Sequence, residues 1–116
     1  MSKRSIIQLS EFDITQKIIE SLSNVCTRSV LFAVKNESKD VTQIASELKI
    51  SLSTVYKTLS TLEDLALAEV DRYEISPEGK KIKLYRSRIG KVEITLDDLE
   101  PKLSLHPNLT NSKSIS

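Results

Sequence analysis

The chain has 116 residues, of which 28% are charged and 39% are apolar, a balance typical of one soluble globular domain. Its 17 Lys and Arg residues nearly balance its 16 Asp and Glu residues, so the net charge of +1 does not by itself indicate a nucleic-acid partner. The one cysteine, Cys26, excludes an intramolecular disulfide and is expected to be a small core residue. The sequence shows no signal peptide and no apolar run near 18 residues, so we expect a cytoplasmic protein without a membrane span.

The N-terminal part predicts two helices. Residues 1–9 are expected to be flexible, and Ser10 followed by Asp13 resembles a capping box that opens a helix over about 11–22. A second helix follows over 25–34, and a polar loop, 36–40, comes after it. The first helix carries an apolar stripe that either its own domain or a second copy of the chain would bury. We favour a homodimer formed through this stripe, outside the core and helped by the third strand; its large aliphatic side chains are Ile14, Ile18, Ile19 and Leu22.

Residues 41–65 predict two amphipathic helices around a tight turn. Ile50 would fill the corner between them, and Ser51 would cap the second helix by accepting a backbone N–H bond. Apolar side chains recur every three or four residues, at Val41, Ile44, Ala45 and Leu48 and then at Leu52, Val55, Leu59, Leu62 and Leu65. This pattern indicates a helix-turn-helix.

The hydrophobic period becomes two after Leu67. It predicts one strand containing Val70 and Ile75 and a second containing Ile82 and Leu84. Ser76-Pro77-Glu78-Gly79 between them has the signature of a type I turn. A third strand is expected through Val92, Ile94 and Leu96, and the polar segment 101–116 is expected to be a disordered tail. The folded domain is thus predicted over 10–100.

The basic charge is local. Residues 77–91 hold six basic side chains against the single acid Glu78, a charge of +5 over one hairpin. A solvated hairpin is the alternative reading of this charge.

Helices, a helix-turn-helix and then a basic hairpin make the α+β order of a winged helix. Segments 27–32, 41–45, 50–59 and 65–70 resemble the corresponding parts of ArsR-like transcriptional regulators. The resemblance implies a regulator that binds double-stranded DNA. Two departures stand out: the helix after Asp40 has no cysteine or histidine with which to bind a metal, and Pro101 with its polar tail leaves little room for the long dimerising helix of many relatives.

The exposed face of the second helix of the motif carries short polar, aromatic and cationic groups suited to a DNA groove, while lysines on the hairpin would reach phosphates. The predicted DNA-binding residues are Thr42, Leu52, Ser53, Thr54, Tyr56, Lys57, Lys80, Lys81 and Lys83. The alternative interpretations, without DNA contact, are a helix face that is simply exposed to solvent and a hairpin whose charge serves solubility. A winged helix that docks other proteins in a transcription or other assembly is the alternative function.

An enzyme is not expected. The one histidine, His106, lies in the predicted tail beside Pro107, and two glycines cannot make a phosphate-binding loop. Asp97 and Asp98 have no partner chemistry in their charged segment. We therefore predict no cofactor and no metal, and a partner set of double-stranded DNA and a second copy of the chain, without a membrane.

Overall fold

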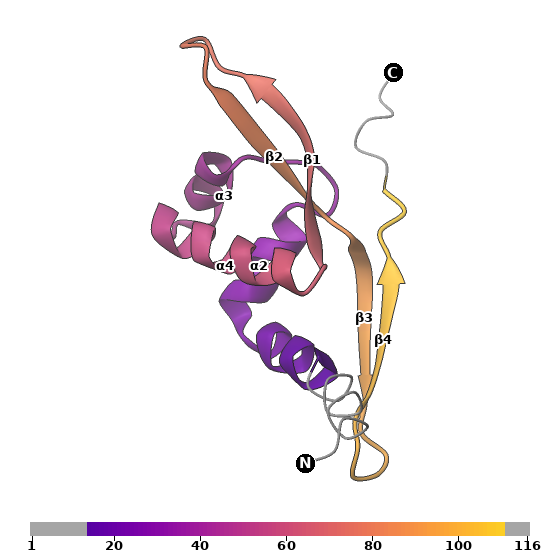
Figure 1. The fold of residues 1–116 in the computed structure, drawn as a ribbon. Coiled ribbons are helices and arrows are strands. Elements are labelled where there is room, and N and C mark those ends of the chain that lie inside the picture. Colours follow the sequence, from indigo (N-terminus) through magenta and orange to yellow (C-terminus); the bar gives the residue numbers. More distant parts are fainter. Residues whose placement is uncertain (1–13, 111–116) are drawn as a thin grey trace, which may run out of the picture.

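The computed structural model describes residues 14–110, and Figure 1 shows their arrangement. The predicted flexible segment 1–9 and the capping residues Ser10 and Asp13 lie outside this range, and so does 111–116 of the predicted tail. A first helix covers 14–23 of the described residues. The elements that follow are α2 (Val25–Ala33), α3 (Val41–Leu48), α4 (Leu52–Asp64), β1 (Ala68–Ile75), β2 (Lys81–Ser87), β3 (Ile89–Thr95) and β4 (Lys102–Pro107).

Each helix after the first begins at a side-chain cap. Asn24 accepts a hydrogen bond from the Thr27 N–H at 3.0 Å, and Ser51 accepts one from the Thr54 N–H at 3.1 Å, as predicted for the start of α4. Asp40 and Gln43 form a reciprocal capping box at α3, with bonds of 2.9 and 3.0 Å. These short polar residues satisfy backbone donors that would otherwise lack partners, so they define where the helices start.

The strands form two separate antiparallel hairpins. β1 pairs with β2 in the wing, which rises above α3, and β3 pairs with β4 in a second hairpin (Figure 1). The predicted turn closes the wing: the Gly79 N–H donates to the Ser76 carbonyl at 2.8 Å. Gly79 has a φ of +84°, a conformation that a side chain would strain.

The two helices of the helix-turn-helix bury their apolar side chains in the core. Ile44 of α3 and Val55, Leu59 and Leu62 of α4 are fully buried, so the predicted apolar stripes face inward. Leu52 instead lies 46% exposed at the start of α4. A short bridge between Lys39 and Tyr85 ties the loop before α3 to β2 through bonds of 3.1 and 2.8 Å. The bridge places the wing beside the motif.

The predicted disordered tail is wrong for residues 102–110. β4 pairs with β3 in a register that sets Leu105 opposite Val92 and Leu103 opposite Ile94. Cross-strand partners share one face of a sheet, so the hairpin has an apolar face, and its Val92 and Leu103 pack against the core. The folded part of the chain therefore extends beyond the predicted boundary at 100.

The first helix also differs from expectation. Ile18 and Leu22 are only 5% and 4% exposed and belong to the core of their own chain, so the prediction that the whole stripe lies outside the core is wrong. Ile19 is half-buried and Ile14 is exposed. Cys26, expected in the core, is only half-buried. The periodicity correctly showed an apolar face, but the core of the same chain buries part of it.

Candidate nucleic-acid interface

Helix α4 presents a polar and aromatic face to solvent. Ser53, Tyr56 and Lys57 are exposed, and Tyr56 keeps 57% of its surface accessible. They alternate with Val55 and Leu59, whose burial fixes the rotation of the helix. The face predicted to meet DNA is therefore presented outward by the packing of the opposite face.

Two of the predicted hydroxyl contacts belong to helix caps. The Thr42 hydroxyl donates to the Asp40 carboxylate at 2.6 Å, and the Thr54 hydroxyl accepts a bond from Ser51 at 2.8 Å. Thr54 is also half-buried. Ser51 lies 3.2 Å from the Ser53 hydroxyl as well, so one small network organises the first turn of α4. Ser53, by contrast, is exposed.

A groove separates the start of α3 and the exposed face of α4 from the wing. Asp40 and Val41 line it beside Tyr85, which is largely buried. Predicted residues from three elements meet around the groove: Thr42, Tyr56, Lys80, Lys81 and Lys83. The remaining predicted residues, Leu52, Ser53, Thr54 and Lys57, lie on α4 outside its lining.

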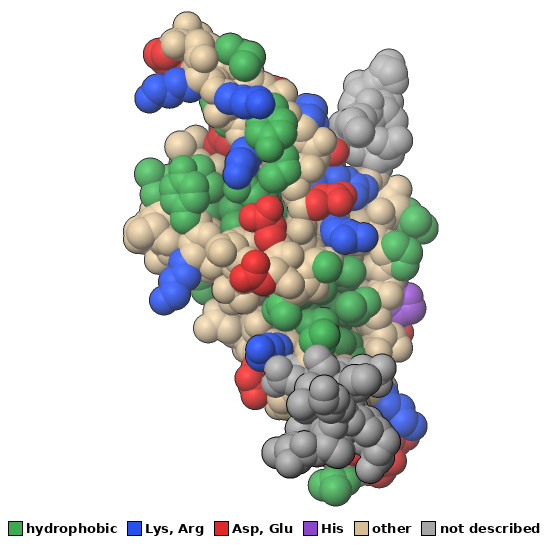
Figure 2. Space-filling view, in the orientation of Figure 1, with side chains coloured by type: hydrophobic (Ala, Val, Ile, Leu, Met, Phe, Trp, Pro, Cys, Tyr) green, Lys and Arg blue, Asp and Glu red, His purple; other side chains and the backbone are tan. Residues whose placement is uncertain are grey.

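The six basic residues of 77–91 divide into two groups. At the base of the wing, Arg86 and Arg88 lie 3.9 and 3.8 Å from Glu69; in β3 of the second hairpin, Lys91 lies 3.8 Å from Glu93. Within residues 14–110, the three lysines nearer the tip form no ion pair: Lys80, Lys81 and Lys83. In the space-filling view, Lys and Arg side chains lie along the projecting wing, and acidic side chains lie at its tip and below it (Figure 2). Positive charge for a phosphate is thus concentrated beside the groove.

Tyr85 is a neutral phenol among the residues that line the groove. Burial raises the pKa of this phenol, and the nearby charge of Glu63 raises it further, followed by Tyr56 and Tyr73. The group therefore stays protonated and can act as donor or acceptor without adding charge.

The sequence reasoning missed Tyr73 of β1. Its ring lies under the Lys81 ammonium, with Nζ 4.6 Å from the ring centroid, and the side chain is 50% exposed. The available signal was an aromatic residue in a strand that was predicted to pair with the basic strand.

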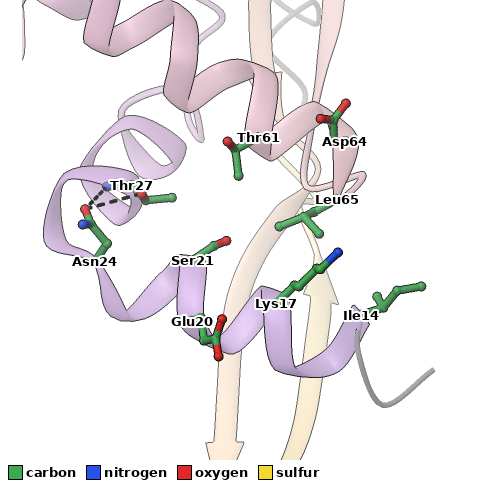
Figure 3. Close-up of a pocket in the computed structure, with 9 residues that line it drawn as sticks. All are labelled: Ile14, Lys17, Glu20, Ser21, Asn24, Thr27, Thr61, Asp64 and Leu65. Carbon is green, nitrogen blue, oxygen red and sulfur yellow. Dashed lines mark hydrogen bonds between the residues drawn. The ribbon is translucent and has the colours of Figure 1, made fainter. Parts of the chain in front are cut away.

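A second hollow lies away from the wing, between the first helix and the end of α4 (Figure 3). Its polar lining includes Lys17, Ser21, Thr61 and Asp64, and Ile14, a predicted dimer residue, stands at one end. Within the part of the chain described, no group of three or more His, Cys, Asp or Glu side chains could hold a metal ion. No helix among the same residues is long and apolar enough to cross a membrane.

Comparison with known proteins agrees with this geometry. Residues 28–70, which run from α2 into β1, match the model of the bacterial regulatory protein arsR family. The chain is also 33% identical over 79 residues to an uncharacterised HTH-type transcriptional regulator of Methanocaldococcus jannaschii, a match that covers 67% of this chain and 80% of the relative. The predicted resemblance and the winged-helix fold are thereby confirmed. The chain belongs to the ArsR family of helix-turn-helix transcriptional regulators.

Proposed function

We propose that the protein regulates transcription by binding double-stranded DNA in a sequence-specific manner, with α4 in the major groove and the wing along the adjacent backbone. The observation that carries this proposal is that the exposed face of α4 and the unpaired wing lysines border one groove. A major groove about 12 Å wide admits a helix, and side chains on its outer face then reach base edges. Lys57 and Tyr56 are the groups long enough to do so, while Lys80 and Lys81 would reach phosphates.

The experiment begins with selection of a bound sequence from a random DNA library, followed by affinity measurements at several salt concentrations. Lys57→Ala should weaken specific binding by roughly 1–3 kcal/mol and change the preference at one position if Lys57 reads a base. The double variant Lys80→Ala with Lys81→Ala should weaken all sequences alike and flatten the salt dependence. Lys102→Ala, on the second hairpin, is the matched control and should do neither.

The opposite pattern would reverse these roles. If the wing pair changed sequence preference and Lys57→Ala did not, the wing would be the reading element. A folded wild-type chain without measurable binding at low salt would contradict the proposal and favour the protein-docking alternative.

We further propose that two copies act together. Ile14 and Ile19 of the first helix keep exposed surface, and Ile94 and Leu105 on the apolar face of the second hairpin are 42% and 37% exposed. Burying such side chains against a partner contributes roughly 1.5–3 kcal/mol each when burial is complete. A twofold-symmetric dimer would bind a nearly palindromic DNA site whose two half-site centres lie roughly 10 base pairs apart.

Light scattering tests the dimer. Ile94→Glu should give a folded monomer with weaker DNA binding, because the charge falls at an exposed margin rather than in the core. Ile75→Glu, at the more exposed wing tip, is the control for oligomeric state. A wild-type monomer at high concentration would contradict the proposed pairing.

The same proposal includes a cytoplasmic location and no catalysis, cofactor or metal. Cys26 and His106 are the only thiol and imidazole in the sequence, whereas a structural zinc site takes about four ligands. They also lie on different elements, since Cys26 is in α2 and His106 is in β4.

A further inference from the structure

The wing carries an exposed aromatic residue that none of the proposed contacts uses. Tyr73 of β1 keeps half of its surface accessible, although a tyrosine usually gains from burying its ring. The Lys81 ammonium from β2 lies above that ring, 4.6 Å from its centroid. This distance is within the range of a cation–π contact, which is strongest when the ring face meets the charge.

The register of the wing shows which way this pair faces. Tyr73 is opposite Lys83, and Ile75 is opposite Lys81, so all four side chains lie on one face of the hairpin. Two residues further along β2 on the same face comes Tyr85, which is buried against the helices and lines the groove. The Tyr73–Lys81 pair therefore lies on the face of the wing that overhangs α4.

The ring restricts a side chain that is otherwise mobile. A lysine has a four-carbon stem with many rotamers, and ordering it on binding costs conformational entropy. The contact with the ring favours one placement of the Lys81 ammonium before any ligand arrives. Lys80 has no aromatic ring beneath it within residues 14–110, so the two adjacent lysines differ in this respect.

We propose that Tyr73 is a positioning residue for DNA binding: its ring holds the Lys81 ammonium on the groove side of the wing, where it meets a phosphate of the strand that flanks α4. This inference rests on the proposed function and assigns a role to a residue outside the predicted contact set. Only the outward side of the ammonium is needed for the phosphate, so the ring and the phosphate can hold it together.

The test is a double-mutant cycle on the full chain. Tyr73→Leu keeps apolar bulk but removes the π face, whereas Tyr73→Phe keeps the π face and removes only the hydroxyl. Affinity for the selected DNA is measured for wild type, both Tyr73 variants, Lys81→Ala and the combination of Lys81→Ala with Tyr73→Leu. Salt dependence is measured for each, and NMR of the free protein follows the Lys81 methylene protons next to the ammonium.

Tyr73→Leu should weaken binding about two- to five-fold, the loss expected from an exposed cation–π contact, and flatten the salt dependence. Tyr73→Phe should match wild type. In the Lys81→Ala background, Tyr73→Leu should have no further effect, since its partner is already gone. The Lys81 methylene protons should show an upfield ring-current shift in wild type and Tyr73→Phe and lose it in Tyr73→Leu.

Equal affinity of Tyr73→Leu and Tyr73→Phe would overturn the inference. So would an undiminished effect of Tyr73→Leu in the Lys81→Ala background, because Tyr73 would then contact DNA directly. Absence of the ring-current shift in wild type would overturn the geometry itself. A wild-type chain that shows the shift but binds no DNA would contradict the proposed function, a failure distinct from loss of the coupling.

Discussion

Asn108 fastens the C-terminal segment to the base of the wing. Its side-chain Nδ2 donates to the carbonyls of Lys35 and Ser87, both at 2.9 Å, and its Oδ1 accepts from the Thr110 N–H at 2.9 Å. Lys35 follows α2 and Ser87 ends β2, so one buried amide joins three parts of the chain. Asn108→Asp keeps the shape of this side chain and removes both of its donors.

The expected loss of stability follows from these bonds. Each net hydrogen bond contributes about 0.5–1.5 kcal/mol, and a buried acceptor left without a donor costs about 1–3 kcal/mol. Two lost donors, and a carboxylate placed against two carbonyl oxygens, therefore lower the free energy of unfolding by about 2–4 kcal/mol. For a domain of this size the melting temperature should fall by at least about 8 °C.

Urea unfolding and thermal unfolding at neutral pH, both followed by circular dichroism, measure the effect. Asn36→Asp adds the same charge at an exposed loop residue and is the matched control. If the two variants lost equal stability, within about 0.5 kcal/mol, the bonds of Asn108 would contribute nothing and the reasoning would be refuted.

Three further predictions concern the fold and the surface. Ile18→Glu should unfold the chain, seen as loss of the helical circular dichroism signal, because it buries a charge in the core, whereas a folded monomer would show that Ile18 belongs to a dimer seam. The pKa of the Glu93 carboxyl is lowered by its hydrogen bond with His106, at 2.8 Å, and by Lys91. The ionised carboxylate therefore stabilises the fold at pH values above the ordinary pKa of a glutamate, and this stabilisation is lost as the pH falls through the lowered pKa of Glu93. Glu93→Gln should accordingly flatten the acid side of a plot of urea midpoint against pH. Dialysis against a chelator should leave folding and DNA binding intact, and retained metal that disappears in Cys26→Ser would contradict this.

Local sequence signals predicted the fold well where the physics is local. Ser51 caps α4 because an N-cap needs only the next few residues. The Ser76–Gly79 turn closes because proline and glycine preset the backbone angles of the same four residues. The helix-turn-helix followed from apolar spacing, since both of its helices bury the stripe that the period defines.

Signals that depend on distant partners were missed. β4 contains only two large aliphatic residues, Leu103 and Leu105, among polar neighbours, and its composition alone resembles a tail. Those residues become a strand face only when Val92 and Ile94 stand opposite them. The stripe of the first helix had the same ambiguity, because a periodic apolar face does not reveal whether its own chain or a second copy covers it.

The sequence predicted the exposure of the candidate site residues better than their hydrogen bonds and ion pairs. Exposure of Tyr56 and Lys57 follows from helical spacing, but the engagement of the Thr42 and Thr54 hydroxyls depends on cap geometry. The hairpin charge was also less uniform than a count suggests. Glu69, in the opposite strand, lies beside both Arg86 and Arg88, a pairing set by register rather than composition.

The basic residues at the two ends of β2 thus lie in different environments. Arg86, near the base of β2, donates to the carbonyls of Asn108 and Thr110 and is mostly buried, so its charge is used to hold the C-terminal segment in place. Lys81 and Lys83, near the tip, are exposed beside the groove. Because the helices and the C-terminal segment hold the base, the tip can project over α4 as a stable hairpin, although a two-stranded sheet alone is only marginally stable. If the proposed DNA contacts hold, stability and phosphate attraction come from different residues of the same strand, and variants at its two ends should separate them.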